Sequence, residues 1–220
     1  MTTRTACTFH PLTPERWADL EALFGERGAC GGCWCMFWRL SRSRWQAQKG
    51  AGNRRAFRRL VASGGTPGIL AYAGGRPVGW CAIAPREDYP GLARSRVLKP
   101  VDETPVWSVT CLFIAKPYRR RGLSAALLSA AADLARSRGA RLVEGYPVEP
   151  AATLPDPFVW TGLASSFRRA GFGEVARRSP TRPIMRKTIP LASPSRPKGP
   201  QNVQRATGSG RGVGSRRPSR

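Results

Sequence analysis

A run of arginines followed by a glycine stands between a strand-like and a helix-like segment in the middle of this chain. The run reads Arg119, Arg120, Arg121, Gly122, Leu123 and Ser124. The first backbone N–H groups of a helix lack partners within the helix, and the aligned peptide dipoles add partial positive charge there. Guanidinium groups bind phosphate oxygens strongly, and a glycine lets a ligand approach the backbone closely. This order of residues therefore predicts a binding site for a pyrophosphate group.

The segments on either side of this turn have the periodicities that such a site needs. Residues 106–115 are rich in strand-forming residues, which predicts a β-strand. After the turn, apolar residues recur at spacings of three and four, which predicts a helix with one buried face. The predicted stripe consists of Leu123, Ala126, Leu127, Ala130, Ala131 and Leu134. An ordinary strand-to-helix connection with solvated arginines is the alternative explanation.

Other elements surround this central unit. A hairpin is expected at Gly74 and Gly75, because glycine readily adopts the positive φ of tight turns. Gly139 is the expected end of the helix that follows the turn. The further predicted strands are residues 5–11, 69–73, 78–84 and 141–146, and the further predicted helices begin at Pro14 and cover residues 53–63 and 158–170.

The arginine–glycine turn resembles the cofactor motif of the GNAT superfamily of N-acetyltransferases. That motif is Arg or Gln, two residues, Gly, one residue, and Gly or Ala. Arg119, Gly122 and Ser124 stand at its three positions, and the serine departs from the family preference. Gly171 and Phe172 resemble the Gly-Phe pair that closes the fourth helix in many family members. The resemblance spans residues 5–188 and implies a three-layer α/β fold, with a mixed twisted sheet of about six to seven strands between helices on both faces.

The chain is expected to contain one globular domain and a tail. Its 41% apolar content suits a domain over residues 1–189. Residues 190–220 are rich in Pro, Ser, Gly and Arg and contain no acidic residue, which predicts a disordered basic tail. The sequence shows neither an apolar run of membrane-spanning length nor a secretory signal, so the cytoplasm is the expected location and no membrane partner is expected.

The resemblance implies an acyltransferase that moves an acetyl group directly from acetyl-CoA to an amine. In this family the cofactor lies between two splayed parallel strands, and a strand N–H polarises its thioester carbonyl. Leu112, Phe113 and Ile114 match the strand positions whose backbone pairs with the pantetheine arm. The turn from Arg119 to Ser124 matches the pyrophosphate site. A domain that binds acyl-CoA without turning it over is an alternative.

The acid and base of such a reaction are carboxylate and tyrosine candidates. An acceptor amine must lose a proton, and the departing thiolate must gain one. Glu144, on the predicted strand after the cofactor helix, is the first candidate base, with Glu149 and Glu103 behind it. Many family members carry a Tyr that acts as the general acid, and an Asn seven residues before it. At these positions this chain has Phe167 and Trp160. Tyr146 is therefore the candidate substitute acid.

Aromatic residues gather between the first two predicted helices. In the family this segment overhangs the acceptor, so Trp34, Cys35, Phe37 and Trp38 are expected to wall a pocket for an apolar or cationic amine. Trp45 follows shortly after them. Packing into a core is the alternative role for these large side chains.

Three thiols lie within six residues, at Cys30, Cys33 and Cys35. A structural zinc site needs a fourth ligand. That ligand would have to come from Cys7, His10, Cys81 or Cys111, because no second cysteine pair exists. We therefore expect no metal, and interpret these residues as small side chains that shape a pocket. A zinc site and a redox-sensitive thiol are the alternatives.

The chain is strongly basic, with a formal charge of +24. Clustered basic residues gain affinity for nucleic acid by releasing counterions. However, only 5 of the 37 basic residues are lysines, so the charge reflects arginine usage, and no known nucleic-acid module is recognisable. A solvated basic surface is the favoured interpretation, and a nucleic-acid or ribosome-associated protein is the alternative. The sequence specifies neither the acceptor, whether small molecule or protein, nor the oligomeric state.

Overall fold

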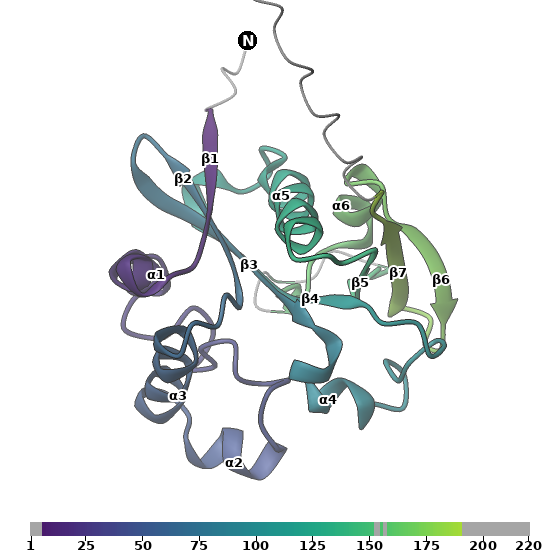
Figure 1. Cartoon of the computed structure of the whole chain (residues 1–220), viewed down its shortest axis with the longest axis horizontal. Coiled ribbons are helices and arrows are strands. Elements are labelled where there is room, and N and C mark those ends of the chain that lie inside the picture. Colours follow the sequence, from purple (N-terminus) through teal and green to yellow (C-terminus); the bar gives the residue numbers. More distant parts are fainter. Residues whose placement is uncertain (1–5, 152–154, 156–157, 191–220) are drawn as a thin grey trace, which may run out of the picture.

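A single mixed β-sheet of seven strands lies between two layers of helices in the computed structural model, which describes residues 6–151, 155 and 158–190 (Figure 1). The strand order is β1-β2-β3-β4-β5-β7-β6. Neighbouring strands of this sheet are antiparallel except for β4 and β5, which are parallel. The expected three-layer α/β fold is therefore confirmed. The predicted tail lies outside the described residues from residue 191 onward.

The strands and helices alternate along much of the chain. The strands are β1 (Cys7–Pro11), β2 (Gly68–Ala73), β3 (Arg76–Pro85), β4 (Trp107–Ile114), β5 (Leu142–Gly145), β6 (Gly173–Arg177) and β7 (Pro183–Thr188). The α-helices are α1 (Trp17–Phe24), α2 (Arg42–Ala47), α3 (Ala51–Ala62), α4 (Pro90–Ala93), α5 (Leu123–Ser137) and α6 (Ala164–Arg169). Short 3-10 helices are η1 (Pro14–Arg16), η2 (Arg86–Asp88) and η3 (Lys116–Tyr118). No helix in this part of the chain is long and apolar enough to cross a membrane.

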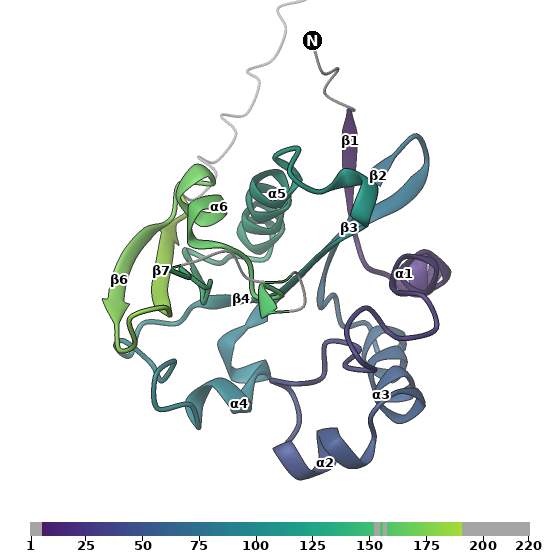
Figure 2. The same cartoon turned by 180° about the vertical axis from the view of Figure 1, so that it is seen from behind.

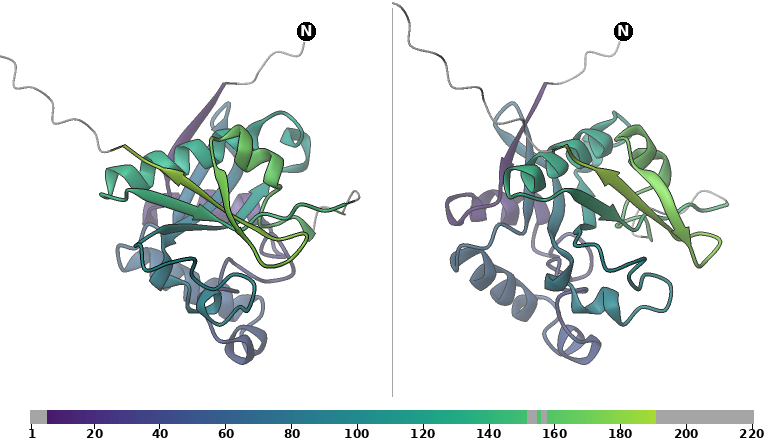
Figure 3. Two further views of the ribbon diagram at one scale, coloured as in Figure 1. Left: turned by 90° about the vertical axis from the view of Figure 1, so that its right-hand side faces the viewer. Right: turned by 45° about the vertical axis from the view of Figure 1, so that its right-hand side comes forward.

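The pleat of β2 divides its side chains between the two helical layers. Ile69 and Ala71 belong to the core beneath α5 and α6, whereas Leu70 belongs to the core beneath α1 and α3. Figures 2 and 3 show these layers, with α5 and α6 on one face of the sheet and α1 and α3 on the other. Strand residues buried on both faces explain why β2 and β3 are almost continuously apolar.

Several local predictions are confirmed. Gly74 and Gly75, with φ of 54° and 75°, form the turn between β2 and β3. Gly139, with φ of 83°, follows the end of α5. The predicted buried stripe of α5 is only partly correct. Ala126 is exposed and Ala130 is half-buried, because the buried face also takes in Leu128, Ala132 and Ala135.

The predicted helix over residues 158–170 is too long. The helix α6 begins only at Ala164. Gly162 has a φ of 88°, a left-handed conformation that cannot continue a right-handed helix. The short helices α2 and α4 were not predicted, because six and four residues carry too little periodicity to detect.

Candidate active site

The strands β4 and β5 separate after three paired residues. Trp107, Ser108 and Val109 pair with β5, which ends at Gly145, while β4 continues to Ile114. The register of β3 and β4 also shifts here, since Val109 and Cys111 lie opposite successive residues of β3 and Thr110 is the extra residue. Such a bulge bends a strand. The second half of β4 therefore has no β5 residue beside it.

The exposed backbone edge of β4 is partly satisfied by the chain itself. The Leu112 N–H donates to the Trp160 carbonyl oxygen at 2.7 Å. The Ile114 carbonyl accepts a hydrogen bond from Arg119 Nε at 2.8 Å. Phe113, between them, packs against the core beneath α1 and α3. Sequence reasoning missed the Trp160 contact, and the one local signal for it was Gly162 inside the predicted helix.

The arginine–glycine turn leads from this edge into α5. Arg120 and Gly122 both have left-handed backbone conformations, with φ of 58° and 82°. Gly122 is the N-cap of α5, and no side chain caps the helix. A Cβ built on Gly122 would meet no described atom within 4 Å, so the space in front of the helix is open. Backbone N–H groups, the helix dipole and the exposed side chains of Arg120 and Arg121 thus combine at one open point.

The aromatic residues expected to form one pocket divide into two groups. Phe37 and Trp38 pack edge to face with ring centroids 4.8 Å apart, and Phe37 also contacts Trp45 and Trp160 at 5.2 and 5.6 Å. We call Phe37, Trp38, Trp45 and Trp160 the aromatic cluster. The Trp38 indole N–H is buried and has no hydrogen-bond partner among the described residues. Because buried donors in folded proteins nearly always have partners, this one marks a candidate contact for a polar ligand group beside the aromatic faces.

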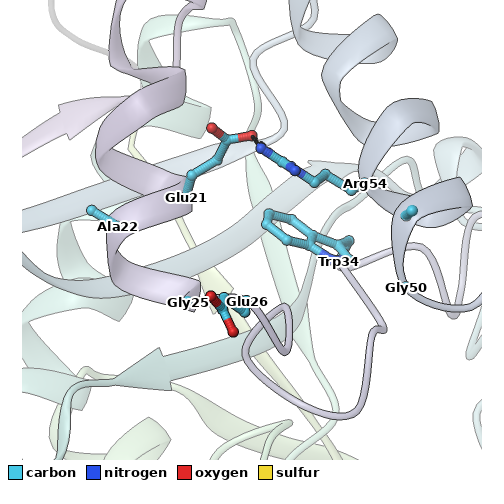
Figure 4. Close-up of a pocket in the computed structure, with 8 residues that line it drawn as sticks. Glu21, Ala22, Gly25, Glu26, Trp34, Gly50 and Arg54 are labelled. Atoms are coloured by element: carbon cyan, nitrogen blue, oxygen red, sulfur yellow. Dashed lines mark hydrogen bonds and ion pairs between the residues drawn. The ribbon is translucent and has the colours of Figure 1, made fainter.

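Trp34 lies apart from the aromatic cluster. It stacks on Trp17 with ring centroids 6.1 Å apart and is 3% exposed. It also lines a hollow of about 380 Å³ between α1 and α3, together with Glu21, Glu26 and Arg54 (Figure 4). Arg54 pairs with Glu21 across this hollow at 2.6 Å.

The cysteines differ in burial, since Cys81 is buried and Cys7, Cys33, Cys35 and Cys111 are partly buried. Cys35 Sγ accepts a hydrogen bond from Trp80 Nε1 at 3.2 Å. Burial raises the pKa of Cys33 to about 11 and the pKa of Cys81 further above its usual range. Cys30 is exposed. Within the described ranges, no three His, Cys, Asp or Glu side chains are arranged to hold a metal ion.

Glu144 and Tyr146 meet in a buried polar network. The Tyr146 hydroxyl donates to Glu144 Oε1 at 2.6 Å and lies 2.8 Å from Ser108 Oγ on β4. Arg86 Nη1 and Arg186 Nε each donate to the Glu144 carboxylate at 2.7 Å. Burial, followed by the charge of Glu144, raises the pKa of Tyr146, so its hydroxyl stays protonated at neutral pH. The hydrogen bonds from Tyr146, Arg86 and Arg186 already occupy both carboxylate oxygens of Glu144.

The other two candidate bases lie elsewhere. Glu149 is half-exposed and forms ion pairs with Arg168 and Arg177, and the hydrogen bond from Arg177 is the main cause of its lowered pKa. Glu103 is exposed. The structure brings Glu144 and Tyr146 together, and Trp38 of the aromatic cluster packs against the same apolar group to which Tyr146 belongs.

Comparison with known proteins places these features in a family. Residues 34–151 match the model of the acetyltransferase (GNAT) family. The fold is similar to a GNAT family acetyltransferase from Listeria monocytogenes, at 11% identity and a TM-score of 0.51, covering 83% of this chain and 95% of that one. The PaiA N-acetyltransferase from Thermoplasma acidophilum, solved with coenzyme A, is similar at 13% identity and a TM-score of 0.48, covering 84% and 99%.

No curated protein matches this sequence. The family model nevertheless covers more than half of the chain, from the aromatic segment through the arginine–glycine turn to a point just beyond the end of β5. This chain belongs to the GNAT family of acetyltransferases, which are acyltransferases.

Proposed function

We propose that this protein transfers an acetyl group from acetyl-CoA directly to an amine acceptor. The observation that carries this proposal is the open N-terminus of α5 at Gly122, placed just beyond the end of a strand whose edge has left its neighbour. The N-terminus of α5 suits a pyrophosphate. The exposed edge of β4 suits an extended arm that forms hydrogen bonds with the strand backbone. When bound, acetyl-CoA would supply the activated thioester.

The residues of the turn and of β4 would hold the donor. The backbone N–H groups of Leu123 and Ser124, at the start of α5, would bind the pyrophosphate together with Arg120 and Arg121. Arg119 already bonds the Ile114 carbonyl, so it braces the end of β4 against the turn. The N–H of Leu112 is the donor on this edge that would polarise a carbonyl.

The buried polar network would supply the proton donor of the reaction and hold it in position. Tyr146 stays protonated and is linked to β4 through Ser108, so we assign it as the proton donor to the leaving thiolate, a step in which its hydroxyl must give up the hydrogen bond to Glu144. Glu144 fits a positioning role better than that of a free base, because a proton taken up by either of its oxygens must displace an arginine or the tyrosine. The acceptor amine must then reach the site already neutral or lose its proton to water.

The acceptor would lie against the aromatic cluster. Phe37 and Trp38 offer ring surface and one unsatisfied indole N–H, so the acceptor would carry an apolar part and a hydrogen-bond acceptor. The proposed pocket therefore keeps Phe37 and Trp38 and adds Trp45, and the Trp160 ring lies against Phe37 and Trp38 when no ligand is bound. Cys35 lies behind it on Trp80, and Trp34 belongs to the core.

The test is release of coenzyme A thiol from acetyl-CoA by the full chain in the presence of amines. A panel of polyamines, amino acids and lysine peptides covers the main acceptor classes. We expect release that depends on both acceptor and enzyme and that is lost in Gly122→Val. Tight binding of acetyl-CoA without release for any amine would instead support a non-catalytic acyl-CoA-binding domain.

A further inference from the structure

The segment of residues 159–162 lies on the strand edge that the donor would need. Its Trp160 carbonyl accepts the hydrogen bond from the Leu112 N–H at 2.7 Å. A backbone N–H has one hydrogen to donate. Leu112 can therefore bond the Trp160 carbonyl or a carbonyl of the bound donor's arm, and the two contacts compete.

This segment is held on β4 by contacts on both sides. Gly162 closes a tight turn with Val159 at 2.8 Å, and its carbonyl accepts from the Val148 N–H at 2.9 Å. The Thr161 hydroxyl is buried and accepts from Arg182 at 3.2 Å. A Cβ added to Gly162 would lie 2.7 Å from Leu112 Cδ1, so the segment packs directly on the strand.

The side chain of Trp160 points to a different part of the site from its carbonyl. Its ring lies 5.6 Å from the Phe37 ring and 6.2 Å from the Trp38 ring, measured between centroids. The backbone of Trp160 thus occupies the donor edge, while its ring fills space in the aromatic cluster. Both contacts belong to one residue, so movement of one disturbs the other.

We propose that Trp160 couples the two substrate sites, so that binding of the coenzyme A arm displaces the Trp160 carbonyl from Leu112 and withdraws the Trp160 ring from the aromatic cluster. This inference rests on the proposed function. The donor then binds first, and the space left by the ring receives the acceptor. Because such linkage is reciprocal, the ring contacts of Trp160 must weaken donor binding.

The test is calorimetric titration of the full chain with two ligands. Coenzyme A carries the pantetheine arm, whereas 3′-phospho-ADP carries the same nucleotide and phosphates without it. The variants are Trp160→Ala and Trp160→Leu, the second of which keeps apolar bulk. The control is Phe158→Ala, because Phe158 belongs to the same stretch of chain but is 65% exposed.

Loss of two aromatic ring pairs should make coenzyme A bind about tenfold more tightly to Trp160→Ala. Trp160→Leu should change affinity in the same direction, and Phe158→Ala should not change it. The affinity for 3′-phospho-ADP should be the same in all four proteins. A gain in affinity for coenzyme A but not for 3′-phospho-ADP is expected only if Trp160 competes with the pantetheine arm for β4.

Two results would overturn this inference and leave the proposed function standing. Unchanged coenzyme A affinity in both Trp160 variants would show that the segment does not compete with the arm. Weakened affinity would show that Trp160 contacts the bound arm instead of yielding to it. Failure of both ligands to bind the wild-type chain would overturn the proposed function itself, and with it the coupling.

Discussion

Arg86 donates from Nη1 to Oε1 of Glu144 at 2.7 Å, and this contact joins the end of β3 to the middle of β5 across the intervening strand. Arg86 also donates to the Tyr146 hydroxyl and, at 2.6 Å, to the Leu98 carbonyl. The Glu144 side chain is almost wholly buried. The network therefore ties together the strands at the point where β4 and β5 separate.

Replacing Glu144 with alanine should destabilise the fold severely. The change leaves Arg86 and Arg186 without the carboxylate that compensates their burial, and breaking a buried ion pair from one side typically costs about 3–5 kcal/mol. Urea unfolding measures this loss. Glu149→Ala is the matched control, because that glutamate forms only half-exposed ion pairs. Equal stability of the two variants would contradict the structural role of Glu144.

Asp102 should stabilise the protein in a pH-dependent way. The hydrogen bonds from Arg186, the nearest at 2.6 Å, hold the pKa of Asp102 well below its usual range. A carboxyl whose pKa is lowered by folding contributes stability above its unfolded pKa of about 4 and loses that contribution as the pH falls toward the folded value.

The Asp102→Asn variant should therefore unfold at a lower temperature than the wild type near pH 6, and the difference should shrink as the pH falls below about 4 toward the lowered pKa of the folded state. Thermal unfolding across this range measures the difference. The control is Asp133→Asn, which removes an exposed ion pair on α5. A constant difference between wild type and Asp102→Asn at every pH would contradict the assigned role of the charge.

Tyr146→Phe should separate chemistry from binding. Loss of a positioned proton donor typically lowers the rate by about 100-fold or more. The phenyl ring keeps the packing, so the affinity for coenzyme A should not change. Steady-state kinetics with the acceptor found in the amine panel measures this effect. An unchanged kcat would leave proton donation to water or to the acceptor.

How much of this site the sequence could predict depends on how local each part is. The turn at Gly122 and helix α5 are adjacent in the chain, so the motif and the apolar periodicity together were sufficient to predict a turn that leads into a helix. The contact between Leu112 and Trp160 joins distant segments through a backbone carbonyl, which no residue type signals. Glu144 could be named as a candidate, but its bonds to Arg86 and Arg186 depend on strand order. Sequence could not show that its oxygens are already bonded.

The cysteines should differ sharply in their reaction with iodoacetamide. Cys30 is exposed and should be alkylated first in the native protein. Burial raises the pKa of Cys33 to about 11, so little of its reactive thiolate is present at neutral pH. Cys81 is buried and should react only after unfolding. Mass spectrometry of peptides from native and unfolded protein measures the order. Early alkylation of Cys81 would contradict the packing of β3.

The most direct measurement is the affinity of coenzyme A for Gly122→Val compared with Gly139→Val. Both glycines have left-handed backbones, with φ of 82° and 83°, and open space around the Cβ position, but they lie at opposite ends of α5. Each substitution should cost similar backbone strain, about 1–2 kcal/mol. If the N-terminus of α5 binds the pyrophosphate, only Gly122→Val should weaken coenzyme A, by about 100-fold for two lost charge-assisted hydrogen bonds. Equal affinity of the two variants would contradict a donor site at this turn.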